Sequence, residues 1–232
     1  MSERAVDLEV SRPTGDSDSL SVRARKHAAW LLDLDGTLYW APGVKLAMAC
    51  ELLLFGMRVL PRLRRFRHEH ERLRDDRDQG DNPFAVQLAR TASALALDVT
   101  ELERDVRTWM IERPRRYVGW FRRSGLLRAI ERFRRAGGRT AVVSDYPALE
   151  KLEALRARDL FEVVIANGEP FGPRRLKPDP DGYLKAAQAL GVPPRSCLVI
   201  GDRDDADGAA ARSAGMDFCQ VRAFRRYLAS QR

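Results

Sequence analysis

Residues 29–38 read Ala-Trp-Leu-Leu-Asp-Leu-Asp-Gly-Thr-Leu, an uninterrupted apolar run that ends in two aspartates. The run does not alternate between apolar and polar residues, as a half-buried strand would. It is typical of a parallel strand that is covered on both faces. Ligand chemistry in parallel sheets gathers at the carboxyl ends of the strands, and Asp33 and Asp35 follow this strand directly. The stretch therefore predicts a fold with a parallel sheet and a site at the carboxyl ends of its strands.

Three further apolar runs have the same character and also end in polar or small residues. They are 140–143, followed by Ser144 and Asp145; 163–165, followed by Ala166 and Asn167; and 198–200, followed by Gly201 and Asp202. Helical patterns at 126–136, 147–155, 180–190 and 206–214 separate these runs. Strands that alternate with helices indicate an α/β domain with a mostly parallel sheet.

The segment 40–123 breaks this alternation and has a helical pattern. The expected helices are 45–60, ended or kinked by Pro61; one from Pro83 to about 97; and one opened by a capping box of Thr100 and Glu103 and ended or kinked by Pro114. The predicted organisation is a poorly ordered polar tail at 1–26, an α/β core at 27–39 and 124–232, and an inserted helical cap at 40–123.

The composition favours a folded protein with an excess of positive charge. Apolar residues make up 44% of the 232 residues, and 41 basic residues against 33 acidic ones give a net charge of +8. Only five of the basic residues are lysines, and a GC-rich genome explains this arginine bias better than a nucleic-acid partner does. The excess charge could still attract anionic substrates or a membrane surface. We expect a cytoplasmic protein for three reasons. The three cysteines have no pairwise spacing, the sequence has no secretory signal, and no apolar stretch could span a bilayer.

Asp33 and Asp35 are the first candidates for chemistry. Two carboxylates two residues apart repel each other, so that the pKa of one is raised unless a cation lies between them. Such a pair suits one ionised nucleophile and one proton carrier, and Gly36 would allow a tight turn beside a ligand. The alternative is an acidic turn without chemistry.

Three later motifs follow strands in the same way. Ser144 could hold a phosphate oxygen or simply cap a helix, and Lys177, between Leu176 and Pro178, could neutralise a phosphate or be a solvated loop residue. In residues 201–208, four aspartates suit Mg²⁺ or form an acidic helix start. The order of these residue types along the chain is stronger evidence for a site of chemistry than any one of them alone.

In this order the sequence resembles the haloacid dehalogenase superfamily of phosphatases and phosphotransferases over residues 28–221. Residues 33–37 look like its first motif, Ser144 like the second, Lys177 like the third, and Gly201-Asp202 with Asp207 like the fourth. The segment 40–123 lies where that family places a helical cap of the first type. The resemblance implies a Rossmann-like core and dependence on Mg²⁺.

The resemblance also implies roles for these residues. Asp33 would carry the phosphoryl group as an aspartyl phosphate, and Asp35 would act as general acid and base. Ser144 and Lys177 would bind the phosphoryl oxygens. Mg²⁺ would be held by Asp33, the backbone carbonyl of Asp35, Asp202 and Asp207. Asp35 favours phosphoester chemistry over dehalogenation, but leaves a phosphomutase open.

Two alternatives concern what the chain does and what it binds. In the favoured one, the chain is an enzyme that binds a small phosphorylated substrate. In the other, the chain is itself a basic binding protein, on an inactive fold of this family, that contacts membrane or nucleic acid. Residues 46–60 are apolar and run into an arginine cluster at 58–67, which could bind a lipid phosphate or an anionic membrane. The preferred interpretation is a packed cap helix with a solvated basic end. His68 and His70 are expected to be exposed.

Overall fold

The structure, a computed structural model, describes residues 27–76 and 78–230. Its centre is a five-stranded sheet in the order β3-β2-β1-β4-β5, with every neighbouring pair parallel. The strands are β1 (Ala29–Leu32), β2 (Arg139–Ser144), β3 (Val163–Ala166), β4 (Cys197–Gly201) and β5 (Asp217–Gln220). The predicted α/β fold with a parallel sheet is confirmed.

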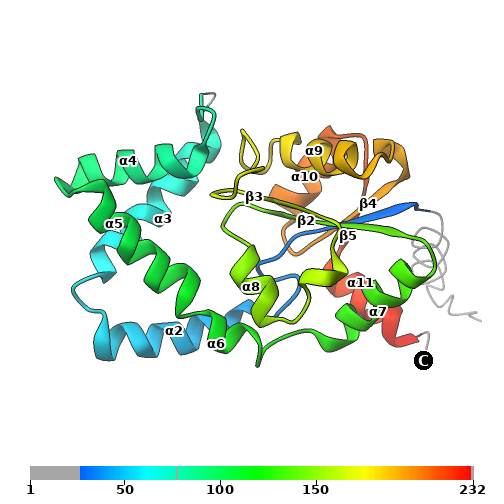
Figure 1. The fold of residues 1–232 in the computed structure, drawn as a ribbon, viewed down its shortest axis with the longest axis horizontal. Helices are drawn as coiled ribbons and strands as arrows, with labels where there is room; N and C mark the ends of the chain where they lie inside the picture. The colour runs from blue at the N-terminus through cyan, green and yellow to red at the C-terminus, as the bar shows by residue number, and fades with distance from the viewer. Residues whose placement is uncertain (1–26, 77, 231–232) are drawn as a thin grey trace, which may run out of the picture.

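Helices cover both faces of the sheet (Figure 1). They are α7 (Ser124–Arg135), α8 (Leu149–Ala154) and α11 (Val221–Ser230) on one face, and α9 (Asp181–Leu190) and α10 (Ala209–Ser213) on the other. Trp30 of β1 stacks on Phe133 of α7 at 4.0 Å between ring centroids and meets Phe224 of α11 edge-on. Ala29 and Leu31 point to the other face and pack with α9 and α10. Burial on both faces explains why the strand is apolar at every position.

The register of the sheet brings the ends of three strands to one edge. Leu32 pairs with Val142 of β2 and with Ile200 of β4. The backbone N–H of Asp33 continues the ladder by donating to the carbonyl of Ile200 at 3.0 Å. Residues that directly follow β1, β2 and β4 therefore share the carboxyl edge of the sheet.

A separate group of helices follows β1 and lies to one side of the core (Figure 1). Its members are α2 (Ala41–Phe55), α3 (Leu60–Asp75), α4 (Pro83–Leu95), α5 (Val99–Val106), a π-helical turn (Arg107–Glu112) and α6 (Arg115–Val118). Phe66 of α3 meets Phe84 of α4 edge-on, with ring centroids 5.9 Å apart. None of the helices in the described ranges combines the length and hydropathy needed to cross a bilayer.

The chain leaves and re-enters the core at adjacent positions. Trp40 donates its backbone N–H to the carbonyl of Phe121 at 2.9 Å, and Arg123 donates to the carbonyl of Leu38 at 2.9 Å. A β-bridge pairs Tyr39 with Arg122. Helices α2–α6 are thus attached to the core through two short, paired segments.

Several expected helix boundaries were wrong. Pro61 does not end a helix; it stands in the first turn of α3, where its missing N–H costs no hydrogen bond. The N-cap of α5 is Asp98, whose side chain accepts from the N–H groups of Thr100 and Glu101, so that Thr100 is not the cap. The short strand β5 and helix α11 were not predicted. The tail expected at 1–26 lies outside the described residues.

Three short helical turns complete the core. They are 3₁₀ turns at Arg158–Leu160 and Pro194–Ser196 and a π-helical turn at Asp204–Gly208. The last of these follows β4 directly and begins the connection to α10. It places Asp207 back against the end of the strand, where the backbone N–H of Arg203 donates to Oδ2 of Asp207 at 3.2 Å.

Candidate active site

Three aspartates meet at the carboxyl edge of the sheet. Asp33 follows β1, Asp202 follows β4, and Asp207 lies in the π-helical turn after β4. One carboxylate oxygen from each lies within 4.8 Å of the other two. Oδ2 of Asp33 is buried and has no hydrogen-bond partner among the described residues. Three carboxylates whose oxygens lie this close together are hard ligands that suit a divalent cation such as Mg²⁺.

Two glycines allow the backbone to approach these carboxylates closely. Gly36 has φ of +96°, and a Cβ there would lie 2.1 Å from Oδ2 of Asp202. A Cβ on Gly201 would lie 2.4 Å from the carboxyl carbon of Asp207. Both contacts are closer than side chains tolerate, so that the cluster requires glycine at both positions.

Lys177 is the cation of the cluster. Its Nζ lies 2.7 Å from Oδ1 of Asp33 and 2.8 Å from Oδ1 of Asp207, and it donates to the carbonyl of Val143 at 2.9 Å. The hydroxyl of Tyr183 also donates to Asp207, at 2.9 Å. Lys177 is buried, so these contacts fix the position of its ammonium group.

The charges in this cluster are not balanced. Burial raises the pKa of Asp33 well above its ordinary value. Lys177 lowers this pKa, and Asp207 and Asp202 raise it further. Burial alone would lower the pKa of Lys177, but Asp207 and Asp33 raise it. Burial and Asp207 likewise raise the pKa of Asp202. A divalent cation among the three carboxylates would stabilise their charged forms, which is the physical reason that this donor set fits a metal.

Asp35 faces a different partner from Asp33, although only two residues separate them. Both of its carboxylate oxygens accept hydrogen bonds from Nζ of Lys151, at 2.7 and 2.8 Å, and the Tyr39 hydroxyl donates to one of them. The Asp35 side chain is 30% exposed, whereas that of Lys151 is 7% exposed. Asp35 is therefore held at the edge of the cluster, within reach of solvent.

Sequence reasoning missed Lys151, for which a weak signal existed. Lys151 lies three residues after Ala148 and four before Leu155, both of which are buried. A lysine on the apolar side of a helix requires a partner for its charge. That partner, Asp35, is 116 residues away in the sequence, so that spacing alone could not identify it.

The remaining predicted residues divide into two groups. Ser144 ends β2 at the same edge of the sheet, and its buried Oγ accepts from the N–H of Tyr146 at 3.2 Å. Asp204 and Asp205, which belonged to the acidic motif, do not join the cluster. They form ion pairs on the surface with Arg212 at 2.9 Å and Arg203 at 2.5 Å.

The sequence matches the family model described as haloacid dehalogenase-like hydrolase over residues 28–215. The chain belongs to the haloacid dehalogenase-like hydrolase family. The predicted resemblance to that superfamily is confirmed by this match, which covers most of the chain, including every residue of the acid cluster.

Individual relatives match shorter stretches of the chain. Protein CbbY of Rhodobacter capsulatus is 47% identical over 60 residues, 26% of this chain and 25% of CbbY. Fructose-1-phosphate phosphatase YqaB of Escherichia coli K12 is 41% identical over 71 residues, 31% of this chain and 36% of YqaB. The matched part thus spans about a third or less of these relatives. The crystal structure of a HAD phosphatase from Thermococcus onnurineus shares the fold, with a TM-score of 0.53 and 23% identity over 82% of this chain and 84% of that one.

Helices α2–α6 of this haloacid dehalogenase-like hydrolase contact the core close to the acid cluster. Nη2 of Arg74, at the end of α3, lies 2.7 Å from Oδ2 of Asp145, which directly follows Ser144. One turn earlier, the ring of His70 stacks on Tyr146, with centroids 4.4 Å apart. The expectation that His70 is exposed was wrong, because this stack buries it, whereas His68 is exposed.

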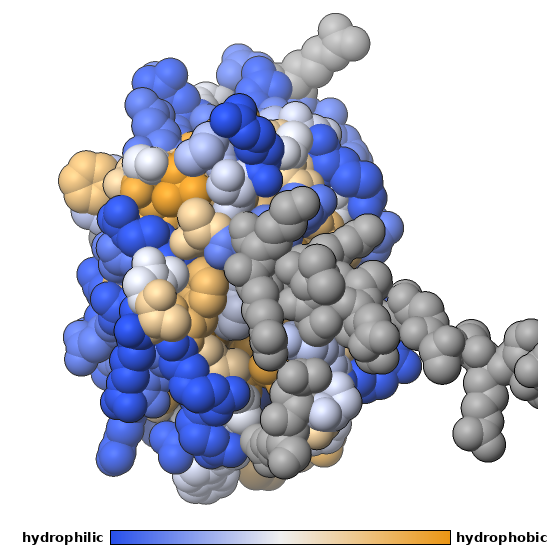
Figure 2. Space-filling model, turned by 90° about the vertical axis from the view of Figure 1, so that its right-hand side faces the viewer, coloured by the Kyte–Doolittle hydropathy of each residue, from blue (hydrophilic) through white to orange (hydrophobic). Residues whose placement is uncertain are grey.

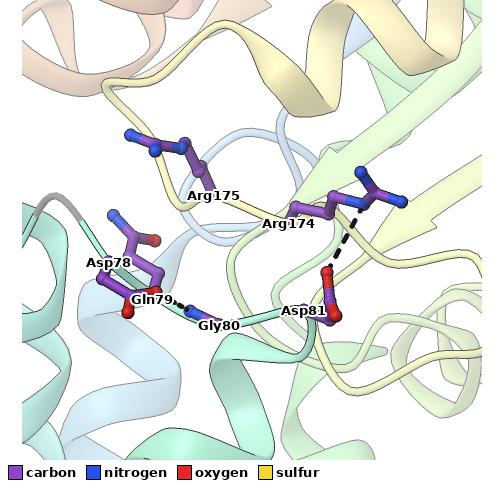
Figure 3. Close-up of a pocket in the computed structure, with 6 residues that line it drawn as sticks. All are labelled: Asp78, Gln79, Gly80, Asp81, Arg174 and Arg175. Carbon is purple, nitrogen blue, oxygen red and sulfur yellow. Dashed lines mark hydrogen bonds and ion pairs between the residues drawn. The ribbon is translucent and has the colours of Figure 1, made fainter.

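A hollow lies between the loop after α3 and the loop that leads to Lys177. It is lined by Asp78, Gln79, Gly80, Asp81, Arg174 and Arg175 (Figure 3). Oε1 of Gln79 accepts from the backbone N–H of Leu176 at 2.7 Å, and Nε of Arg174 lies 3.9 Å from Oδ1 of Asp81. None of the cluster aspartates lines the hollow. Its bonds instead connect the α3–α4 loop to the segment that positions Lys177.

Proposed function

We propose that this protein is an Mg²⁺-dependent phosphatase that hydrolyses a phosphate monoester through an aspartyl phosphate on Asp33. The observation that carries the proposal is the contrast between two carboxylates. Asp33 is buried, with one oxygen bound to Lys177 and the other without a hydrogen-bond partner among the described residues. Asp35 is partly exposed and bound to Lys151. Such different surroundings suit a nucleophile and a proton carrier.

In the first half of the reaction, the free oxygen of Asp33 forms a bond to phosphorus as the bond from phosphorus to the leaving oxygen breaks. Asp35 gives a proton to the leaving oxygen, so that the product departs as a neutral alcohol. Lys177 and Ser144 bind the non-bridging oxygens and stabilise the charge that they carry in the transition state. The position of Lys177, 2.7 Å from Asp33, supports this role.

In the second half, Asp35 takes a proton from water and the water oxygen attacks phosphorus. The bond between phosphorus and Asp33 breaks, inorganic phosphate leaves, and Asp35 is again protonated for the next cycle. The partial exposure of Asp35 supports this step, because the base must reach both the leaving group and a water molecule.

Asp33, Asp202, Asp207 and the backbone carbonyl of Asp35 are the groups that we propose to hold Mg²⁺. Bound there, the ion would neutralise charge on the phosphoryl oxygens and on the carboxylates. The fit of the three carboxylates to a cation supports this assignment. Asp207 would have a second function, since it also holds Lys177 in place.

We further propose that residues 40–123 form a cap over this site and that the substrate is a small phosphorylated compound. The contacts of Arg74 and His70 with the loop after β2 support a cap, because they place α3 beside the predicted phosphate-binding residue Ser144. The name of the relative YqaB, a fructose-1-phosphate phosphatase, supports a small phosphate ester.

The test is phosphate release from a generic aryl phosphate, with Mg²⁺ and with EDTA, for the wild type and Asp33→Asn. We expect turnover that requires Mg²⁺ and that the substitution lowers by several orders of magnitude, roughly 10⁴-fold. Asp204→Asn is the matched control, because Asp204 pairs with Arg212 outside the cluster and should leave the rate unchanged. A wild type that fails on a panel of phosphomonoesters would favour a phosphomutase or a binding protein.

A further inference from the structure

Helix α2 presents apolar side chains to solvent. Leu46 is 68% exposed, Leu53 64%, Leu54 and Phe55 73% each, and Met57, in the turn after the helix, 56%. These five residues are called the α2 outer surface. Contiguous exposed apolar residues on a soluble domain mark a surface that contacts a protein or a membrane.

Four other residues of α2 pack. Gly43, Val44, Met48 and Glu51 are buried against the neighbouring helices. A helix that is apolar on all sides is normally buried on all sides. The interpretation of α2 as a simply packed cap helix is therefore incomplete, because it leaves the α2 outer surface without a partner among the described residues.

Two exposed tryptophans lie beside the first turn of the helix and its neighbour α6. Trp40, the N-cap residue of α2, is 51% exposed and contacts Phe121 edge-on at 5.6 Å. Trp120 is 78% exposed and contacts Tyr117, whose hydroxyl donates to Glu51 of α2 at 2.6 Å. Tryptophan is enriched where proteins meet the headgroup region of a bilayer.

The exposed charges of α2 and of the turn after it are positive. Lys45 and Arg58 are both exposed. Residues 41–59 contain one acidic residue, Glu51. Glu51 is buried and is neutralised by Arg113 at 3.0 Å and Arg116 at 3.3 Å. The basic run continues through α3, where Arg64 and Arg67 are also exposed and no acidic residue occurs before Glu69.

We propose that the α2 outer surface, with Lys45 and Arg58, docks this protein on a bilayer of anionic lipids. Leucine, phenylalanine and methionine side chains would enter the boundary between headgroups and acyl chains, and the basic residues would lie against lipid phosphates. Helix α2 lies toward the left of Figure 1, whereas Figure 2 faces the right-hand, core end of the molecule, where hydrophilic side chains separate apolar areas.

A second copy of the chain fits this surface less well than a lipid bilayer does. In a symmetric dimer, the same patch contacts itself. Lys45 and Arg58 of one copy would then face the basic residues of the other, and the patch has no exposed acidic side chain on α2 to pair with them. Anionic headgroups supply the missing negative charge.

The test is sedimentation of the full chain with vesicles of pure phosphatidylcholine and with vesicles that contain about one third phosphatidylglycerol. We expect binding to the anionic vesicles, lost in high salt, and a decrease in partitioning of about tenfold or more in Leu54→Glu/Phe55→Glu. Phe171→Glu is the matched control, because Phe171 is 79% exposed on the core and should not affect binding.

Two results would overturn the proposal. One is equal binding of the wild type and Leu54→Glu/Phe55→Glu to anionic vesicles, or no binding by either. The other is a dimer in analytical ultracentrifugation that Leu54→Glu/Phe55→Glu converts to a monomer, which would assign the surface to a second copy. Turnover of a soluble aryl phosphate by the same variant shows whether it is folded and separates failure of docking from failure of the proposed phosphatase activity.

Discussion

Gly36 determines how closely the loop after β1 approaches the acid cluster. A Cβ at this position would lie 2.1 Å from Oδ2 of Asp202, and the φ of +96° is unfavourable for any other residue. We predict that Gly36→Ala lowers kcat by about a hundredfold, because displacing the loop by an ångström misplaces the reacting carboxylates. Steady-state kinetics on an aryl phosphate measures the effect.

Gly137 provides the control for backbone strain at Gly36. Its φ is +88°, but a Cβ there would meet nothing within 4 Å. Gly137→Ala should therefore destabilise the fold by about 1 kcal/mol and leave kcat unchanged. Equal losses of activity in the two variants would show that strain alone, and not contact with Asp202, accounts for the effect.

Lys151 is predicted to position Asp35. Its Nζ binds both carboxylate oxygens of Asp35, so that Lys151→Met would leave the carboxylate held by the Tyr39 hydroxyl alone. We expect kcat to fall about tenfold to a hundredfold with a smaller change in KM, because a loosely held acid transfers protons less efficiently. Lys185→Met, which removes a lysine paired with Asp181 on the surface, is the control. A higher kcat in Lys151→Met would mean that the lysine instead restrains Asp35 from the substrate.

At the scale of elements, one buried ion pair connects α3 to the loop after β2. The side chains of Arg74 and Asp145 are 10% and 9% exposed, with 2.7 Å between Nη2 and Oδ2. Asp145 also accepts from the backbone N–H of Lys177 at 3.1 Å. The same carboxylate therefore holds both α3 and the segment of Lys177 in place.

We predict that Arg74→Met lowers the free energy of unfolding by about 3–5 kcal/mol, because it leaves Asp145 buried without its partner. Denaturation in urea measures this. Arg90→Met is a matched control, since Arg90 and Asp76 also lie 2.7 Å apart but are 41% and 40% exposed. That surface pair should contribute less than about 1 kcal/mol. Similar losses in both variants would contradict the view that burial determines the contribution of the pair.

The elements also show what sequence patterns could predict. Strands β1–β4 were predictable because burial on both faces makes each a continuous apolar run. The short strand β5 (Asp217–Gln220) has just one buried residue, Cys219, and gave no such signal. Helix α3 was missed because it is rich in charge and has Pro61 in its first turn, although a proline is well tolerated there.

At the scale of the whole molecule, the acid cluster could be predicted and its supports could not. Recognisable elements flank three of its residues: Asp33 follows β1, Asp202 follows β4 and Lys177 precedes α9. A parallel sheet necessarily brings such positions to one edge. The pairs of Asp35 with Lys151 and of Asp145 with Arg74 join residues 116 and 71 positions apart. No local spacing encodes contacts of this range, and the packing of α3 on the core determines the second of them.

The most direct test of the mechanism is to trap the phosphoryl group on the enzyme. The wild type would be mixed with an aryl phosphate and Mg²⁺, quenched in acid within the first turnover, digested and analysed by mass spectrometry. Asp33 is the one cluster carboxylate with a buried oxygen that lacks a hydrogen-bond partner, so we predict phosphate on the peptide that contains it and none in Asp33→Asn. Phosphate release with no labelled peptide, or a label on another residue, would contradict the account.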